Sequence, residues 1–475
     1  MNSRRRFFKE NAIGVASLAL PSMLTADGLC AEINTVDRTH HAPTAKNIIY
    51  MCQIGAPSQF DMFDRKPVLN ERDGEELPQS FLDRVDFAQI KESNPKLMGT
   101  PYKFQQHGES GQWISELMPH TAGIVDDLTF VHTCQAEDQN HMFAELQMST
   151  GWRRFGRPSL GSWVLYGLGS ESENLPGFMV LRSGMHPRSK GANYGPGFLP
   201  GTMQGTPLQS NGPPILNLGT PQGFSQQSQS ATIDAVNALN RLKVRENADP
   251  DIETRIANYE MAFKMQSSAP ELLDMSGETQ ETLELYGISD PAQPSYARNC
   301  LLARRLVERG VRFVELFHGD WDHHTSIYQR LPGECKITDQ ASAALILDLK
   351  RNGLLDDTLV IWGGEFGRSS VAQKSLTPGE PVGRDHHVEA FTMWFAGGGV
   401  ARGKSIGETD EIGFDATTDR WHIHDLHATF LHALGLDHKR LTYRHQGRDY
   451  RLTDVFGNVK TELFKSYNFH PSQYS

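Results

Sequence analysis

The amino-acid sequence predicts an α/β protein whose strands are buried on both faces. Short apolar runs bounded by Gly, Asp or Asn suit such strands, and they recur at 46–52, 128–132, 176–181, 311–317, 358–362 and 391–395. Segments with helical apolar spacing stand between them, as at 297–309 and 337–349. The chain has 475 residues, of which 38% are hydrophobic, so it can bury a large core.

Charge and cysteine usage limit the kinds of partner. The formal net charge is −11, and residues 1–31 are net basic, so the remainder is more acidic still. An acidic chain argues against nucleic acid or an anionic membrane surface as the main partner. Beyond residue 31 the cysteines are far apart and form no C-x-x-C pair, which excludes a thiolate metal cluster. We expect buried free thiols, with a disulfide as the alternative.

Residues 1–31 have the features of an export signal. The segment SRRRFFK at 3–9 matches the twin-arginine pattern, and a weakly apolar stretch follows at 12–20. That stretch is too short to span a bilayer. We therefore expect a twin-arginine signal peptide, a periplasmic or secreted protein and no integral membrane span. The alternative is a basic tail with a chance pair of arginines.

The remainder is expected to form one domain over residues 46–460. Segment 152–226 is rich in Gly, Pro, Ser and Asn and is predicted to be loop-rich, a kind of segment that often carries specificity. Segment 230–310 is predicted to be mostly helical, with Asp249-Pro250 as a start signal. No internal repeat is visible.

Polar side chains gather next to the predicted strands. Strand 311–317 is followed by HGDWDHH at 318–324, in which five residues can bind a metal. Strand 358–362 is followed by GGEFGR at 363–368, and GRDHH at 383–387 precedes strand 391–395. In open α/β sheets ligands bind where strands end. Imidazole with carboxylate suits Zn²⁺ or Mn²⁺, whereas an all-oxygen set suits Ca²⁺ or Mg²⁺. The sequence therefore predicts a divalent metal site, with the metal unassigned.

Three of these segments also carry a family resemblance. GGEFGR at 363–368, GRDHH at 383–387 and HDLHATFLHALGLDH at 424–438 resemble the family catalogued as domain of unknown function 1501, exported bacterial proteins of the alkaline phosphatase and sulfatase superfamily. The resemblance runs from about Asn47 to Val459. It implies a three-layer α/β/α sandwich with a mixed, mostly parallel sheet, alkaline phosphatase-like. It supplies no substrate.

The resemblance implies metal ligands at several strand ends. The superfamily has an aspartate after its first strand, for which Asp61 is the nearest candidate, with Ser58 and Asp64 as alternatives. It has an Asp and a His after strand 311–317, which match Asp322 with His323 or His324. Adjacent residues of an extended segment point to opposite sides, so only one of these histidines need face a metal.

Two further segments complete the implied ligand set. Glu365 stands where the superfamily has the first residue of an Asp-His pair, and Phe366 in the second place cannot ligate. His387 matches a later metal histidine, and its neighbour His386 ranks second. The candidate ligands are Asp61, Asp322, His323, His324, Glu365, Asp385, His386, His387 and His424.

His141 and Arg368 are the candidate catalytic residues. Segment 138–151 resembles the superfamily's nucleophile segment, and the nucleophile position falls at about His141. No Ser, Thr or Cys stands at 137–144, so His141 binds an anion or a metal, attacks phosphorus itself, or only caps the helix and packs. Arg368 grips the anionic oxygens of a substrate, or pairs with Glu365 or Asp385.

Two functions are compatible with these residues. The first is an exported metal-dependent hydrolase of sulfate or phosphate esters, acting on a small molecule or a polysaccharide. The second is a non-catalytic metal- or glycan-binding protein of the cell envelope with the same fold. The dense His, Asp and Glu set favours the first function, and the missing hydroxyl or thiol nucleophile favours the second.

Overall fold

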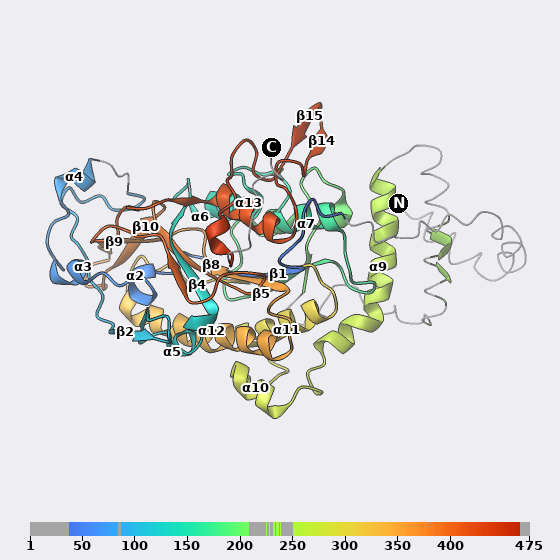
Figure 1. Cartoon of the computed structure of the whole chain (residues 1–475), viewed down its shortest axis with the longest axis horizontal. Helices are drawn as coiled ribbons and strands as arrows, with labels where there is room; N and C mark the ends of the chain where they lie inside the picture. The colour runs from blue at the N-terminus through green and yellow to red at the C-terminus, as the bar shows by residue number, and fades with distance from the viewer. Residues whose placement is uncertain are drawn as a thin grey trace, which may run out of the picture. The chain divides into compact units, whose positions relative to one another are not determined.

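A mixed β-sheet runs through the protein (Figure 1). The computed structural model describes residues 38–83, 87–208, 250–375 and 377–465, with isolated positions between 225 and 238. Residues Thr39–Ser475 form one compact unit. The predicted signal peptide at 1–31 lies outside the described residues.

The main sheet is parallel except for one strand. Its order is β12-β4-β11-β8-β1-β7-β5-β6, with β13 paired to β4. The strands are β1 (Asn47–Gln53), β4 (Leu128–Gln135), β5 (Phe178–Ser183), β6 (Thr206–Pro207), β7 (Phe313–His318), β8 (Thr358–Gly363), β11 (Phe391–Ala396), β12 (Lys404–Ile406) and β13 (Trp421–His422). Only β11 runs antiparallel to its neighbours, β4 and β8. The predicted mixed, mostly parallel sheet is confirmed.

Helices cover both faces of this sheet, which gives the predicted three layers (Figure 1). One face packs on α5 (Pro119–Ala122), α9 (Pro250–Leu273), α10 (Gln280–Tyr286), α11 (Tyr296–Glu308) and α12 (Ile327–Arg351). The other face packs on α6 (His141–Thr150), α7 (Leu160–Leu168) and α13 (Ile423–Ala433). Shorter helices are α2 (Gln59–Met62), α3 (Pro67–Glu71), α4 (Gln79–Leu82), η1 (Val125–Asp127), η2 (Lys190–Tyr194), η3 (Gly201–Met203) and η4 (Thr461–Leu463).

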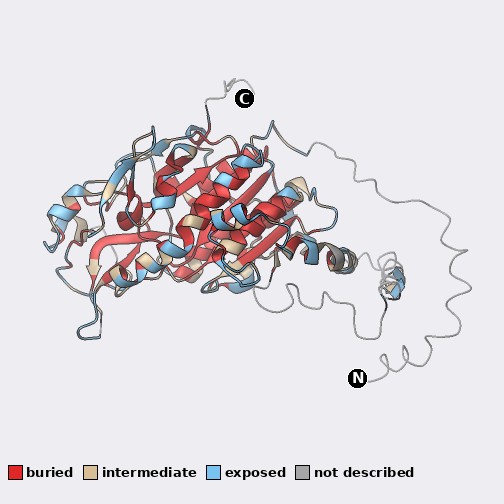
Figure 2. Ribbon diagram, turned by 90° about the horizontal axis from the view of Figure 1, so that it is seen from below, coloured by how far each residue is buried: buried red, intermediate tan, exposed pale blue. Residues whose placement is uncertain are grey.

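Alternation along β1 explains why its run is apolar throughout. Ile49 and Met51 belong to the core on one face, whereas Ile48 and Tyr50 belong to the core on the other. Because both faces are covered, every position of the strand is buried, as Figure 2 shows for the centre of the sheet. The four cysteines of the described chain are buried and free, as expected: Cys52, Cys134, Cys300 and Cys335.

Three two-stranded ribbons lie beside the main sheet. They are β2 (Phe104–His107) with β3 (Gln112–Ser115), β9 (Gly367–Gln373) with β10 (Gly383–His387), and β14 (Tyr443–His445) with β15 (Arg448–Tyr450). The β9–β10 ribbon contains a register shift between Arg384 and His386. That ribbon carries part of the functional site.

The two segments singled out by composition are only partly described. Segment 152–226 contains α7, β5, β6 and two 3₁₀ helices joined by loops, and residues 209–224 lie outside the described part. Segment 230–310 contains α9, α10 and α11, and residues 239–249 lie outside it. Among the helices that are described, none combines the length and the apolar character needed to cross a membrane.

Candidate metal centre

Four side chains from distant parts of the sequence meet where the parallel strands end. His141 is the first residue of α6, directly after β4, and Asp322 and His324 follow β7. His386 comes from β10. Asn140 fixes the start of α6, because its side chain accepts a backbone N–H of the first turn at 3.1 Å. The helix therefore begins at the site.

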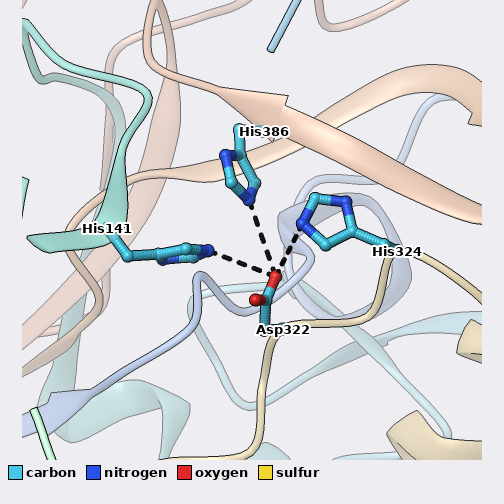
Figure 3. A group of neighbouring side chains, drawn as sticks. All are labelled: His141, Asp322, His324 and His386. Atoms are coloured by element: carbon cyan, nitrogen blue, oxygen red, sulfur yellow. Dashed lines mark ion pairs between the residues drawn. The ribbon is translucent and has the colours of Figure 1, made fainter. Parts of the chain in front are cut away.

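The three imidazole rings converge on one carboxylate oxygen (Figure 3). Asp322 Oδ1 lies 2.9 Å from His324 Nε2, 3.2 Å from His141 Nε2 and 3.5 Å from His386 Nε2. One ligand atom from each residue falls within 4.8 Å of every other. Three nitrogens and one oxygen thus lie close enough to bind a single ion.

The far nitrogen of each ring is held by an oxygen acceptor. His141 Nδ1 lies 2.5 Å from Glu365 Oε1, and His386 Nδ1 lies 2.6 Å from the carbonyl oxygen of Gln139. His324 Nδ1 lies 2.6 Å from the side-chain oxygen of Gln373. Since each of these oxygens accepts, each Nδ1 carries the proton and each Nε2 keeps its lone pair. Partners of this kind orient the ligands of metal sites.

The resulting arrangement requires positive charge at its centre. Three Nε2 lone pairs face a carboxylate, and the Nε2 atoms of His141 and His386 are buried without a hydrogen-bond partner in the described chain. Gln89 donates its amide to His324 Nε2 at 3.2 Å, which agrees with a lone pair there. A buried polar atom without a partner is unfavourable, and a bound cation would satisfy all four donors together. The residues therefore fit a metal ion.

The same contacts shift the pKa values of the side chains in the centre. Burial acts to raise the pKa of Asp322, but the surrounding imidazoles and the Arg368 guanidinium outweigh it and hold that pKa far below its usual range. Burial acts to lower the pKa of His141, yet Asp322 and Glu365 together raise it. Burial lowers the pKa of His386 to about 3. A proton therefore competes with a metal for His141 Nε2, whereas His386 stays neutral.

The centre opens into a pocket of ≈ 530 Å³. Arg188 lines it and donates from Nη2 to Asp322 Oδ2 at 2.8 Å, while its backbone N–H donates to the buried Glu145 at 2.7 Å. The lining residues are Ala88, Gln89, Asp138, Gln139, Asn140, His141, Arg188, Asp322, His324 and His386. This set contains no Phe, Tyr or Trp and suits a small polar ligand.

Glu365 and Arg368 support the centre from beneath. Glu365 is fully buried, and besides holding His141 it accepts the backbone N–H of Gly55 at 3.0 Å. Arg368 is also fully buried and donates to Asp322 Oδ1 at 2.7 Å. Its other donors go to backbone carbonyls of Gly55, Ala56, Trp321 and Arg384. Arg368 does not grip a substrate as expected, because it is fully buried, does not line the pocket, and each of its guanidinium nitrogens is bonded inside the protein.

Asp61 is not brought to the centre. It is fully buried, accepts a hydrogen bond from Ser58 at 2.5 Å and pairs with Arg384 Nε at 3.0 Å. The expectation that Asp61 is a ligand there is wrong, because both carboxylate oxygens are used by this pair. Asp385 is also outside the centre: its Oδ2 accepts the backbone N–H groups of Gln89 and Ile90, and its Oδ1 accepts that of His386.

The ranking of the two adjacent histidines is reversed. His386 faces the centre, whereas His387 lies 2.7 Å from the carbonyl oxygen of Phe414 through its Nε2. His323, the alternative to His324, is buried away from the group, and burial lowers its pKa to about 3. Each pair follows the alternation of an extended chain, in which neighbours point to opposite sides.

His424 belongs to a different group, formed with Glu137 and His422. His422 Nδ1 accepts the backbone N–H of His424 at 3.2 Å, so neutral His422 carries its proton on Nε2, 3.2 Å from Glu137 Oε1. A protonated Nε2 has no lone pair for a metal. This second group is therefore a hydrogen-bonded pair with a neighbouring histidine, and it does not fit an ion.

Fold and site together define an α/β protein with a three-histidine, one-aspartate centre at the ends of its parallel strands. The chain belongs to the family described as "Protein of unknown function (DUF1501)", whose model matches residues 45–464. The resemblance seen in the sequence is thereby confirmed. No curated protein matches the sequence.

Several solved structures are similar at low identity. Ps i-CgsB in complex with k-i-k-neocarrahexaose has 11% identity and a TM-score of 0.37, covering 82% of this chain and 72% of that one. The lipoteichoic acid synthase LtaP from Listeria monocytogenes has 9% identity and a TM-score of 0.34, covering 84% and 74%. The alkaline phosphatase from the Antarctic bacterium TAB5 has 12% identity and a TM-score of 0.29, covering 75% and 92%.

Proposed function

We propose that this protein is a metal-dependent hydrolase of phosphate or sulfate esters, with a divalent ion held by His141, Asp322, His324 and His386. The supporting observation is the convergence of three Nε2 lone pairs on Asp322 Oδ1, with every ring fixed through its other nitrogen. Three nitrogens and one carboxylate oxygen suit Zn²⁺, Mn²⁺ or Fe better than Ca²⁺ or Mg²⁺, which prefer oxygen alone.

The chain's own residues bind and orient the ester. A divalent ion in such a site supplies Lewis-acid polarisation and lowers the pKa of water. Arg188 lines the pocket beside Asp322, and its guanidinium attracts the anionic oxygens of a sulfate or phosphate group. Asp138 lines the same pocket and is positioned to take a proton from attacking water. Glu365 keeps His141 in the tautomer that leaves its Nε2 unprotonated.

Water is the attacking group in this proposal. None of the residues lining the pocket carries a hydroxyl or thiol. Glu365 holds Nδ1 of His141, and in this proposal the metal takes Nε2, so His141 is not free to attack phosphorus. Direct attack by water inverts configuration at phosphorus and leaves no covalent intermediate. A phosphohistidine trapped on His141 would contradict this route.

A metal analysis followed by an ester panel tests the proposal. Protein purified without chelators should contain about one divalent ion per chain. The metal-loaded protein should hydrolyse p-nitrophenyl phosphate, bis-p-nitrophenyl phosphate or p-nitrophenyl sulfate, and Asp322→Asn should abolish both metal retention and turnover. Metal retained without turnover of any ester would instead favour the non-catalytic metal- or glycan-binding function, which the lack of a nucleophile in the pocket also supports.

We propose, in addition, that the chain is exported through the twin-arginine route. The proposal rests on the segment SRRRFFK at 3–9 and the short apolar stretch after it. Replacing Arg4, Arg5 and Arg6 together by Lys should leave the precursor in the cytoplasm, as measured by fractionation and immunoblotting. Normal export of that variant would refute this route.

A further inference from the structure

Three cavities join into one groove away from the metal centre. The central cavity, of ≈ 370 Å³, shares Asn70, Thr100 and Pro101 with a second cavity of ≈ 420 Å³. It shares Arg65 and Lys66 with a third cavity of ≈ 400 Å³. Because neighbouring cavities have walls in common, they lie next to one another, and we call the three together the basic groove. Each cavity is within the size range of ligand sites in proteins.

Positive side chains dominate the middle of the basic groove. The central cavity is lined by Arg65, Lys66 and Lys103 and by no carboxylate. Lys96 and Lys374 line the second cavity, together with the carboxylates Asp73 and Glu92.

Three of these lysines are unpaired. Lys96, Lys103 and Lys374 are exposed and have no carboxylate partner in the described part of the chain. An excess of unpaired cations is notable on a chain with a net charge of −11. Such a patch attracts anions locally even though the whole protein repels them.

An aromatic surface lies at one end of the groove. Trp113 lines the third cavity with 38% of its surface exposed, and the Arg65 guanidinium lies 4.2 Å from its ring centre. In the same cavity Asp64 pairs with Lys66 at 3.1 Å and accepts a hydrogen bond from Thr409 at 2.9 Å, so its charge is neutralised. Glu408 also lines this end. Arg65 covers one face of the Trp113 ring, so a sugar would pack its C–H face against the part of the ring that Arg65 leaves exposed.

We propose that the basic groove binds an anionic polysaccharide, a chain of sugar rings that carries sulfate, phosphate or carboxylate groups. Lys96, Lys103 and Lys374 contact the charged groups, and Trp113 packs against a sugar ring. The groove extends over three cavities, which fits a polymer better than a monosaccharide. The acidic remainder of the chain argues against a nucleic acid as the occupant, and the oligonucleotide probe below tests that alternative.

Strand β9 links the basic groove to the metal centre. Ala372 and Lys374 line the groove, and Gln373 between them holds Nδ1 of His324. No residue lines both the groove and the pocket of the metal centre. Binding in the groove therefore does not depend on the metal or on hydrolysis, and it can be measured on metal-free protein.

Calorimetric titration of the full chain tests this proposal. The probes are a chondroitin sulfate hexasaccharide, an alginate hexasaccharide, a neutral dextran oligomer and a single-stranded oligonucleotide. We expect both anionic saccharides to bind, with affinity that falls as salt is raised because salt screens exposed charges. The triple variant Lys96→Gln, Lys103→Gln and Lys374→Gln should bind about tenfold more weakly, since each exposed charge pair contributes modestly. Trp113→Ala should weaken binding at all salt concentrations.

A matched variant separates the groove from overall charge. Lys336, Lys439 and Lys465 are exposed and line none of the three cavities, and their joint replacement by Gln changes the net charge equally. This control should bind the anionic saccharides as the unmodified protein does. Equal loss in both triple variants would overturn the proposal, as would no binding of either anionic saccharide, equal binding of dextran, or tighter binding of the oligonucleotide. If the protein binds the anionic saccharides but hydrolyses no ester, only the proposed hydrolase activity is refuted.

Discussion

Replacing His386 by Ala tests the metal centre most sharply, because its neighbour His387 supplies a matched control. His386 offers Nε2 to the centre, 3.5 Å from Asp322 Oδ1, whereas His387 points the other way and bonds to the carbonyl oxygen of Phe414. Both rings are buried, so both substitutions remove a similar packing contribution. Only His386→Ala removes a donor of the centre.

The expected effect can be worked out from ligand linkage. A metal present at 100 times its Kd stabilises the native state by about 2.7 kcal/mol. If removal of one of the four donors weakens metal binding by about 100-fold, about 0.4 kcal/mol of that stabilisation remains. The native state is then less stable by about 2 kcal/mol. For a chain of this length, such a loss corresponds to a Tm change of about 2–3 °C.

The assay compares the Tm of metal-loaded and EDTA-treated protein for each variant. The unmodified protein and His387→Ala should gain the same Tm increment on metal loading, even though His387→Ala lowers both values. His386→Ala should lose most of that increment. If His386→Ala keeps the full increment while His387→Ala loses it, the ligand assignment is wrong.

Three other predictions follow from the contacts around the site and in the core. Glu365→Gln should weaken metal binding by about 10–100-fold in a chelator competition, because Nδ1 of His141 loses the carboxylate that holds it. Unchanged metal affinity in this variant would contradict the supporting role of Glu365. Arg384→Met leaves the buried Asp61 without its ion-pair partner and should lower the free energy of unfolding, measured by urea denaturation, by about 3–5 kcal/mol. Arg402→Met, which removes an exposed ion pair with Asp356, should lower it by at most about 1 kcal/mol. Burial lowers the pKa of His427 to about 4, below the 6.5 of the unfolded chain, so the native state binds fewer protons between these two pH values. The free energy of unfolding should therefore fall as pH drops from 6.5 toward 4, by at most about 1.4 kcal/mol per pH unit. A His427→Gln variant with the same pH slope would refute that contribution.

Strand ends were predictable from the sequence because apolar runs and the polar clusters after them are local patterns. Asp322 and His324 directly follow a strand, and Glu365 follows another, so their placement at one edge of the sheet needed only parallel pairing. His141 was indicated by the resemblance of segment 138–151 to the superfamily's nucleophile segment. These four residues lie at or beneath the centre, where the local pattern indicated a site.

Other residues depended on contacts that no local pattern contains. The choice of His386 over its neighbour depends on the register shift that follows Arg384 in the β9–β10 ribbon. Asp61 is excluded by an ion pair with Arg384, more than 300 positions away. Arg188 lies in a loop of segment 152–226 and carries no motif, and Gln373 has no signal beyond lying on a strand. Only the folded chain reveals these partners.

The order in which the centre is assembled follows from where its four donors lie in the sequence. Residues 141, 322, 324 and 386 come together only when β4, β7 and the β9–β10 ribbon have been packed. The unfolded chain therefore offers no comparable chelator, and an ion bound at this centre would enter during or after folding. If the chain folds before twin-arginine transport, the cytoplasmic supply of free metals selects the ion. The metal found in the mature protein would then reflect the ions available where the chain folds, and not those available where the protein acts.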